Sequence, residues 1–127
     1  MGTVRILIAD NHDLVRSAIS QLIRAEGWEV CGSVSTGKDA VQKAVELKPD
    51  LLILDHRMPD GDGLSVGRDI RAFLPNVPML LCTMFASPDL EREAQKCGFQ
   101  GVVQKSDGAA LIAVIRSALV SKPTISP

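Results

Sequence analysis

Residues 51–55 read Leu-Leu-Ile-Leu-Asp, a run of four large apolar side chains that ends in a carboxylate. Pro49 and Asp50 precede this run, and the turn-forming segment Pro-Asp-Gly-Asp-Gly follows at residues 59–63. A short apolar run between turn signals favours a strand that is buried on both faces. Such strands are typical of parallel sheets covered by helices. The stretch therefore predicts an α/β fold, with Asp55 at the carboxyl end of a buried strand.

The alternation of apolar runs and helical patterns continues along the chain in both directions. The pattern predicts strands at residues 4–9, 28–34, 51–54, 79–83 and 101–104. Each strand is followed by apolar residues spaced three and four apart, which predict helices within residues 14–23, 37–48, 64–74, 88–97 and 111–119. Ser87 and Asp107 are placed to cap two helices, and Gly27, Pro49 and Gly98 to end three. Five such units predict a doubly wound five-stranded parallel sheet.

Length and composition bound the class of protein. The 127 residues, 46% hydrophobic and 23% charged, fit one globular domain, which we expect at residues 1–121, with a tail or the start of a linker at residues 122–127. The net charge of −1 argues against nucleic acid contacts from this domain. Three cysteines without C-x-x-C spacing argue against disulfides and a zinc site. Without a signal peptide or an apolar run of about 20 residues, we expect a cytoplasmic location and no membrane contact.

Polar side chains gather at the ends of the predicted strands. Asp10 and Asn11 follow the first strand, Asp55 ends the third, Thr83 ends the fourth and Lys105 follows the fifth. Ligands of open doubly wound sheets bind outside the carboxyl ends of the strands. Taken singly, each residue has an ordinary role, because an Asp after a strand usually forms a turn or caps a helix. We interpret their convergence in one crevice as the functional signal.

These side-chain types suit phosphoryl transfer. Two neighbouring carboxylates repel unless a cation joins them, and oxygen ligands select a hard cation such as Mg²⁺. An aspartate can attack phosphorus, after which catalysis depends on positioning and charge neutralisation. We expect Asp55 to accept a phosphoryl group, Mg²⁺ and Lys105 to neutralise it, and Thr83 to donate to it. His12 and His56 are expected to be loop residues without a metal role.

Four short motifs resemble the receiver domain of two-component response regulators over essentially the whole chain. They are residues 8–12 (Ile-Ala-Asp-Asn-His), 55–63 (Asp-His-Arg-Met-Pro-Asp-Gly-Asp-Gly), 81–83 (Leu-Cys-Thr) and 104–105 (Gln-Lys). The resemblance implies a flavodoxin-like (βα)5 fold with strand order 2-1-3-4-5. The early Asp-Asn-His and late Lys-Ser-Asp are most similar to receivers that precede helix-turn-helix DNA-binding domains.

The resemblance also implies roles for individual residues. Asp55 takes a phosphoryl group from a histidine kinase or phosphotransfer protein. The implied ligands of Mg²⁺ are Asp10, Asn11, Asp55 and the backbone carbonyl of Arg57. Lys105 pairs with the phosphoryl group and Thr83 moves toward it, which shifts the face made by the fourth helix, fifth strand and fifth helix. In this family that face commonly dimerises or docks a partner. Such a domain is not an enzyme, and only self-phosphorylation and self-dephosphorylation are expected of it.

The chain departs from the receiver pattern at Asn11, Val102 and Met84, and at Ser106, where many members have Pro. Asn11 stands where receivers usually carry a second acid, so we expect weaker Mg²⁺ affinity. Val102 stands at the switch position that is usually Tyr or Phe, so the aromatic part of the switch cannot operate in its usual form. Met84 is bulkier than the common Ala. Together with Phe85, it is expected to narrow access to Asp55 and to slow phosphoryl transfer or hydrolysis.

Two other classes lack their motifs. Phosphatases of the haloacid dehalogenase type need Asp-x-Asp after the first strand, but Asp10 and Asp13 are three residues apart. A flavodoxin-type FMN carrier needs aromatic flanks for the flavin, but the chain has no Tyr and one Trp. One alternative stays open, a degenerate receiver that acts as a phosphorylation-independent protein-interaction module. Asn11 and Val102 favour it, whereas the retained phosphoacceptor, hydroxyl and lysine oppose it.

Overall fold

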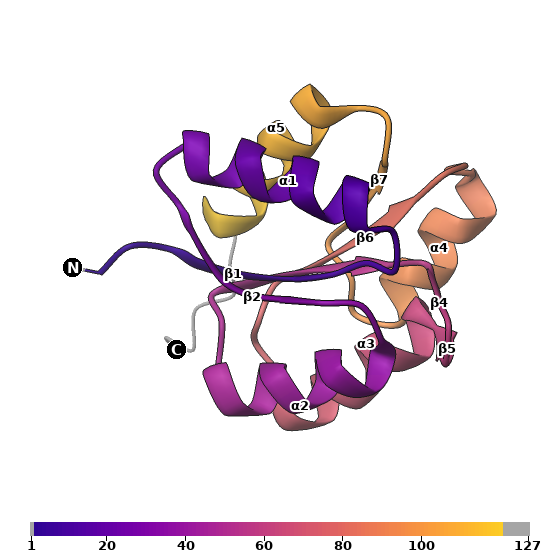
Figure 1. Ribbon diagram of the computed structural model, residues 1–127. Coiled ribbons are helices and arrows are strands. Elements are labelled where there is room, and N and C mark those ends of the chain that lie inside the picture. The colour runs from indigo at the N-terminus through magenta and orange to yellow at the C-terminus, as the bar shows by residue number, and fades with distance from the viewer. Residues whose placement is uncertain (1, 121–127) are drawn as a thin grey trace.

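The computed structural model describes residues 2–120, in which five parallel strands form one sheet with helices on both faces (Figure 1). The strands are β1 (Arg5–Ala9), β2 (Glu29–Val34), β3 (Leu51–Asp55), β6 (Met79–Thr83) and β7 (Gly101–Gln104). Their order is β2-β1-β3-β6-β7, which confirms the order 2-1-3-4-5 among the five long strands. The predicted tail at 122–127 lies outside the described residues.

The helices form two layers around the sheet. One face is covered by α1 (Asp13–Ala25) and α5 (Gly108–Val120), and the other by α2 (Gly37–Leu47), α3 (Gly63–Phe73) and α4 (Pro88–Lys96) (Figure 1). Every residue of β3 and β6 is buried, whereas the edge strands β2 and β7 are partly exposed. The continuous apolar run of β3 is explained by its central position between two helical layers.

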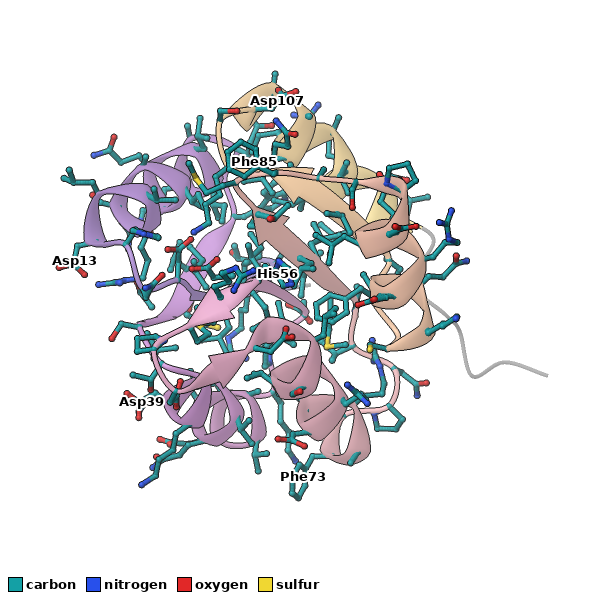
Figure 2. All side chains as sticks on the ribbon, turned by 90° about the vertical axis from the view of Figure 1, so that its right-hand side faces the viewer. Asp13, Asp39, His56, Phe73, Phe85 and Asp107 are labelled. Carbon is teal, nitrogen blue, oxygen red and sulfur yellow. The ribbon has the colours of Figure 1, made fainter. Side chains whose placement is uncertain are left out.

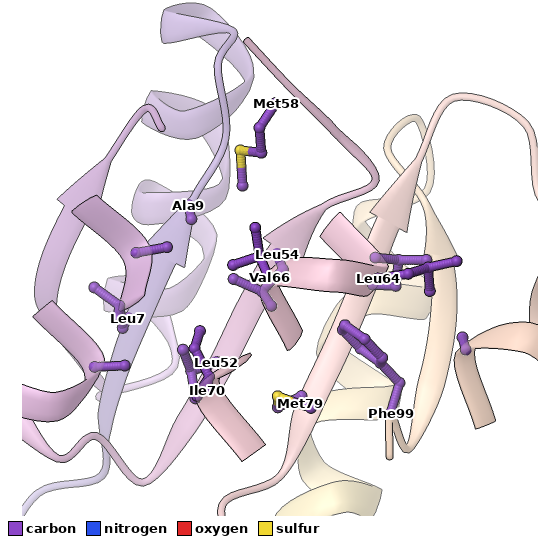
Figure 3. Close-up of a cluster of buried hydrophobic side chains, with 14 of the residues drawn as sticks. Leu7, Ala9, Leu52, Leu54, Met58, Leu64, Val66, Ile70, Met79 and Phe99 are labelled. Carbon is purple, nitrogen blue, oxygen red and sulfur yellow. The ribbon is translucent and has the colours of Figure 1, made fainter. Parts of the chain in front are cut away.

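The core is divided by the sheet into two clusters. Leu7, Leu52 and Leu54 pack on the side of α2, α3 and α4, against residues such as Val66 and Ile70 (Figure 3). The alternate residues of the same strands face the other side, against α1 and α5. Burying each such Leu or Ile contributes about 1.5–3 kcal/mol relative to leaving it exposed. Both clusters therefore hold the strands between the two layers of helices.

Local signals begin and end the helices as predicted. The Ser87 hydroxyl accepts a hydrogen bond from the backbone N–H of Leu90 at 3.1 Å and caps α4. A carboxylate oxygen of Asp107 accepts one from the backbone N–H of Ala110 at 3.0 Å, at the start of α5. Gly27 and Gly98, with φ of +86° and +92°, directly follow the C-caps of α1 and α4. Such positive φ angles suit glycine best.

Two short strands that the sequence does not predict lie in and beside the turn-forming segment at residues 59–63. Strands β4 (Arg57–Met58) and β5 (Gly61–Asp62) pair as a short antiparallel ribbon, and α3 begins directly at Gly63. Strands of two residues carry no recognisable period, and Pro and Gly are read as loop signals. Gly63 matters for packing, because a Cβ there would lie 2.1 Å from the carbonyl oxygen of Asp55.

Candidate functional site

The carboxyl ends of β1, β3, β6 and β7 meet at one edge of the sheet, which faces the viewer in Figure 2, with His56 near the centre. At this edge the ammonium of Lys105 lies 3.1 Å from Oδ2 of Asp10 and 2.9 Å from Oδ1 of Asp55. All three side chains are almost fully buried, with 2%, 4% and 4% exposure for Asp10, Asp55 and Lys105. The structure thus brings together both predicted carboxylates and the predicted lysine.

Strand register explains why these residues are level with one another. Ala9 of β1 pairs with Leu54 of β3, so the next residue of each strand, Asp10 and Asp55, comes at the same height. Asp55 in turn pairs with Cys82 of β6. At the far side, the backbone N–H of Lys105 donates to the carbonyl of Thr83 at 2.8 Å, which continues the ladder beyond β7.

The cluster is short of positive charge. Two buried carboxylates surround one ammonium, which leaves one negative charge without a partner among Asp10, Asp55 and Lys105. Within residues 2–120, Oδ2 of Asp10 is a buried side-chain oxygen that lacks a hydrogen-bond partner, since the ammonium approaches it only as an ion pair. Buried polar atoms of this kind are rare and call for a ligand or an ion. The oxygen is therefore suited to hold a cation.

Asn11 and the carbonyl of Arg57, the other two predicted ligands, lie beside Asp55. The amide of Asn11 is assigned with its nitrogen inward, where it donates to Oδ2 of Asp55 at 2.7 Å and to the carbonyl oxygen of Arg57 at 3.3 Å. In this orientation Asn11 is a hydrogen-bond donor to the carboxylate. The amide must rotate to present its oxygen to a cation.

His12 joins the cluster, which the sequence interpretation missed. It lies in the predicted position before α1, but its Nδ1 is 3.4 Å from Oδ1 of Asp10, 3.9 Å from Oδ2 of Asp55 and 3.2 Å from the ammonium of Lys105. One ligand atom from each of Asp10, His12 and Asp55 lies within 4.8 Å of the other two. The available signal was its spacing, two residues after Asp10 at a helix start, where histidine is not a preferred cap.

A hollow of about 340 Å³ opens above Asp55. Its lining residues are His12, Asp55, His56, Arg57, Thr83, Met84, Phe85 and Lys105. The Thr83 hydroxyl lies at this hollow but accepts a hydrogen bond from the backbone N–H of Phe85 at 3.3 Å, so it is engaged with its own loop. Met84 and Phe85 are 58% and 82% exposed at the rim, and Figure 2 shows Phe85 above His56.

Val102 lies away from this hollow, on the edge strand β7. It is half-buried against the core and lines a second hollow of about 460 Å³ beside α4, together with residues such as Ala94 and Phe99. The predicted switch position therefore borders an open hollow.

The cysteines take no part in the cluster. All three are free thiols, and burial raises the pKa of Cys82, beneath the carboxylates, to about 12. That thiol therefore stays protonated at neutral pH, and a protonated thiol is not a metal ligand. Among residues 2–120, we find no helix with the length and apolar character needed to cross a membrane.

Comparison with known proteins identifies the family. The model of the response regulator receiver domain matches residues 6–116. The chain is 30% identical over 126 residues to the response regulator GacA of Pseudomonas viridiflava, covering 98% of this chain and 59% of that protein. It is 35% identical over 112 residues to the response regulator VraR of Staphylococcus aureus, covering 87% of this chain and 54% of that protein. The chain thus spans little more than half the length of these relatives.

A solved structure agrees with these matches. A LuxR-family two-component response regulator from Aurantimonas superposes with a TM-score of 0.89 at 30% identity, covering 99% of this chain and 91% of that one. The match covers the sheet, the five helices and the edge where the acidic cluster lies. The chain belongs to the family of response regulator receiver domains, the signalling domains of two-component systems.

Proposed function

We propose that this domain is a phosphoacceptor in a two-component phosphorelay and that Asp55 receives the phosphoryl group from a histidine kinase or phosphotransfer protein. The observation that carries the proposal is the contact of Lys105 with both Asp10 and Asp55 at the carboxyl edge of the sheet. The hollow of about 340 Å³ above Asp55 gives a donor a path to the carboxylate.

In the proposed transfer, a carboxylate oxygen of Asp55 forms a bond to phosphorus while the bond from phosphorus to the donor's imidazole nitrogen breaks. The leaving imidazole takes up a proton from water. Lys105 places an ammonium against the oxygens that gain charge, and such positioned charge is the main contribution of a protein to phosphoryl transfer. The domain is proposed to add only self-phosphorylation and self-dephosphorylation to this step.

The residues present fit Mg²⁺. The proposed ligands are Asp10, Asn11, Asp55 and the backbone carbonyl of Arg57. All are oxygen donors once the Asn11 amide turns, and Oδ2 of Asp10 lacks a hydrogen bond, as expected of an atom that takes a cation. When bound, Mg²⁺ supplies positive charge that balances the carboxylates and the phosphoryl oxygens.

The output is proposed to leave through the surface formed by α4, β7 and α5. Thr83 would release its hydrogen bond from Phe85 and turn toward the phosphoryl group, and Lys105 would pair with that group. Such a new charge biases an equilibrium between two states. We propose that the shifted surface forms a homodimer or docks a partner. We also propose that residues 1–121 are the receiver and residues 122–127 a tail or linker. The domain is proposed to act in the cytoplasm and to make no contact with nucleic acid itself.

Acetyl phosphate or phosphoramidate with Mg²⁺, followed by intact mass, tests the proposal. The wild type should gain the mass of one phosphoryl group, and Asp55→Asn should gain none. Asp69→Asn, which changes an exposed acid on α3, is the matched control and should be modified like the wild type. A wild type without an adduct, or an adduct that persists in a folded Asp55→Asn, would exclude Asp55 as the acceptor.

A second candidate function is a degenerate receiver that binds partners without phosphorylation. The inward Asn11 amide favours it, because this amide already satisfies Asp55 and Arg57 as a donor. The open hollow beside Val102 favours it as well. In this case the wild type would form no adduct, and Asp55→Asn would bind the same partners with unchanged affinity.

A further inference from the structure

We propose that Nδ1 of His12 is an additional ligand at this metal site and that it strengthens the binding of divalent first-row transition-metal ions, such as Co²⁺ and Zn²⁺, without strengthening that of Mg²⁺. The inference rests on the proposed function in one respect, because it concerns the same metal site. It concerns which ion the site selects, a property that can be measured without any phosphoryl group.

The first support is distance. Ligand atoms that lie about 2.0–2.2 Å from one zinc ion are separated by about 3.4 Å when the coordination is tetrahedral. Nδ1 of His12 is 3.4 Å from Oδ1 of Asp10 and 3.9 Å from Oδ2 of Asp55. The side chain of His12 is more than half exposed, so it is free to close the longer gap by a small rotation.

The second support is that these residues already converge on a positive charge. The ammonium nitrogen of Lys105 lies 3.1 Å from Asp10, 2.9 Å from Asp55 and 3.2 Å from Nδ1 of His12. One acceptor atom from each of the three residues thus surrounds a single cation. A metal ion and this ammonium would compete for the same carboxylates.

The third support is the direction of the imidazole lone pair. Nδ1 faces two donors, the ammonium of Lys105 at 3.2 Å and the inward amide nitrogen of Asn11 at 3.1 Å. In the neutral tautomer that carries its hydrogen on Nε2, the lone pair of Nδ1 points at these two donors. The nitrogen aimed into the cluster is therefore the one able to bind a metal.

The fourth support is that the helix start leaves this side chain unused. His12 is the N-cap residue of α1, yet its side chain makes no capping hydrogen bond. The backbone N–H of His12 donates to Oδ1 of Asp10 at 2.8 Å, which fixes the residue beside the carboxylate. The other oxygen of Asp10 is buried and lacks a hydrogen bond, and the ammonium of Lys105 lies 3.1 Å from it as an ion pair.

The donor set then decides the ion. Mg²⁺ is a hard cation that prefers oxygen ligands, whereas imidazole suits first-row transition metals. Asn11 brings no charge to the site, and His12 brings a nitrogen, so the two residues together shift the preference away from Mg²⁺.

The experiment measures metal binding by calorimetry on the tag-free chain at about pH 8, above the ordinary histidine pKa of about 6.5. The chain has two histidines, so His56→Gln is a matched control for His12→Gln. His56 lines the same hollow, but its Nε2 is 3.9 Å from Oδ1 of Asp62, toward the β4–β5 ribbon. His12→Asn, which introduces a good capping residue, guards against an effect on folding.

We expect both His12 variants to weaken Co²⁺ and Zn²⁺ binding about tenfold or more, since loss even of an outer-shell partner costs 10–100-fold. Their Mg²⁺ affinity should be unchanged, and His56→Gln should match the wild type with every ion. In the wild type, Zn²⁺ should also shift the nitrogen resonance of His12 Nδ1 in NMR spectra of the ¹⁵N-labelled chain.

Two results would overturn the inference while leaving the proposed function intact. One is Co²⁺ and Zn²⁺ affinity that is equal in His12→Gln and the wild type, together with loss of all metal binding in Asp10→Asn. The other is an unshifted His12 Nδ1 at saturating Zn²⁺. Conversely, a chain that binds Co²⁺ through His12 but forms no phosphoryl adduct would support the inference and exclude the proposed function.

Discussion

Oδ1 of Asp60 accepts a hydrogen bond from the backbone N–H of Gly37 at 2.7 Å, across 23 residues of sequence. Its second oxygen accepts from the backbone N–H of Lys38 at 2.9 Å. These N–H groups belong to the first turn of α2, where a helix leaves donors without internal partners. Asp60 therefore ties the turn between β4 and β5 to α2. Because β4 begins at Arg57, whose carbonyl is a proposed metal ligand, this contact also steadies one wall of the site.

Replacing Asp60 with Asn should lower stability at neutral pH. The two backbone N–H groups hold the pKa of the Asp60 carboxylate below its usual value. A lowered pKa means that the stabilisation is present above the ordinary value of about 3.9 and is lost as the pH falls through the lower folded-state value. Urea titrations should show a lower midpoint for Asp60→Asn at neutral pH, with the gap to the wild type closing in acid. Asp69→Asn should show no such convergence.

Gly63→Ala should disturb the site through the backbone. The added Cβ would lie 2.1 Å from the carbonyl oxygen of Asp55, so the start of α3 or the end of β3 must move. Overpacking of this kind costs about 1–3 kcal/mol. Gly2→Ala is the control, because a Cβ there meets nothing within 4 Å. We expect a lower urea midpoint and slower acetyl phosphate labelling for Gly63→Ala, but not for Gly2→Ala. Equal midpoints and equal labelling rates in the two variants would contradict the close approach of residue 63 to the Asp55 carbonyl.

Lys105→Met should destabilise the chain without metal and make its stability depend on Mg²⁺. Removing one partner of a buried ion pair costs about 3–5 kcal/mol, and here it leaves Asp10 and Asp55 facing each other. Thermal unfolding should show a larger gain on adding Mg²⁺ for the variant than for the wild type. Adding Asp10→Asn to this variant should recover part of the loss. A variant that responds to Mg²⁺ like the wild type would argue against a shared cation site.

Asn11→Asp should raise Mg²⁺ affinity and lower the stability of the metal-free protein. The change replaces an amide that donates to Asp55 at 2.7 Å with a third carboxylate in the same cluster. Like charges repel without a cation and bind it more strongly when it is present. Calorimetric titration gives the affinity, and thermal unfolding in EDTA gives the metal-free stability. No gain in Mg²⁺ affinity would contradict the expectation that Asn11 weakens this site.

Met84→Ala should speed the loss of the phosphoryl group from Asp55. Met84 and Phe85 stand at the rim of the hollow above the carboxylate, so a smaller side chain opens the path for water. Dephosphorylation is followed by intact mass after removal of the phosphodonor. Phe73→Ala, an exposed aromatic change on α3, is the control and should leave the lifetime unchanged. An unchanged lifetime of the phosphoryl group in Met84→Ala would show that Met84 does not restrict the access of water to Asp55.

The parts of the fold that depend on local pattern could be predicted from the sequence. The apolar run at 51–54 and the capping residues Ser87 and Asp107 act over a few residues, and each appears in the structure as predicted. The sequence does not predict the ribbon of β4 and β5, because each strand is too short to show a period. The sequence predicts which residues of the candidate site follow the strands, but not which of their atoms are in contact.

The sequence by itself determined which chemical groups end the strands, because the order of strands, helices and turns follows from periodicity and local capping. Only the tertiary structure decided how these groups meet. Nδ1 of His12 reaches Lys105 across 93 residues, and Asn11 lies against Asp55 across 44. The direction of the Asn11 amide and the engagement of Thr83 with Phe85 depend on such contacts. The physical reason is that register and packing between distant strands decide which side chains come into contact, whereas local propensity acts over a few residues.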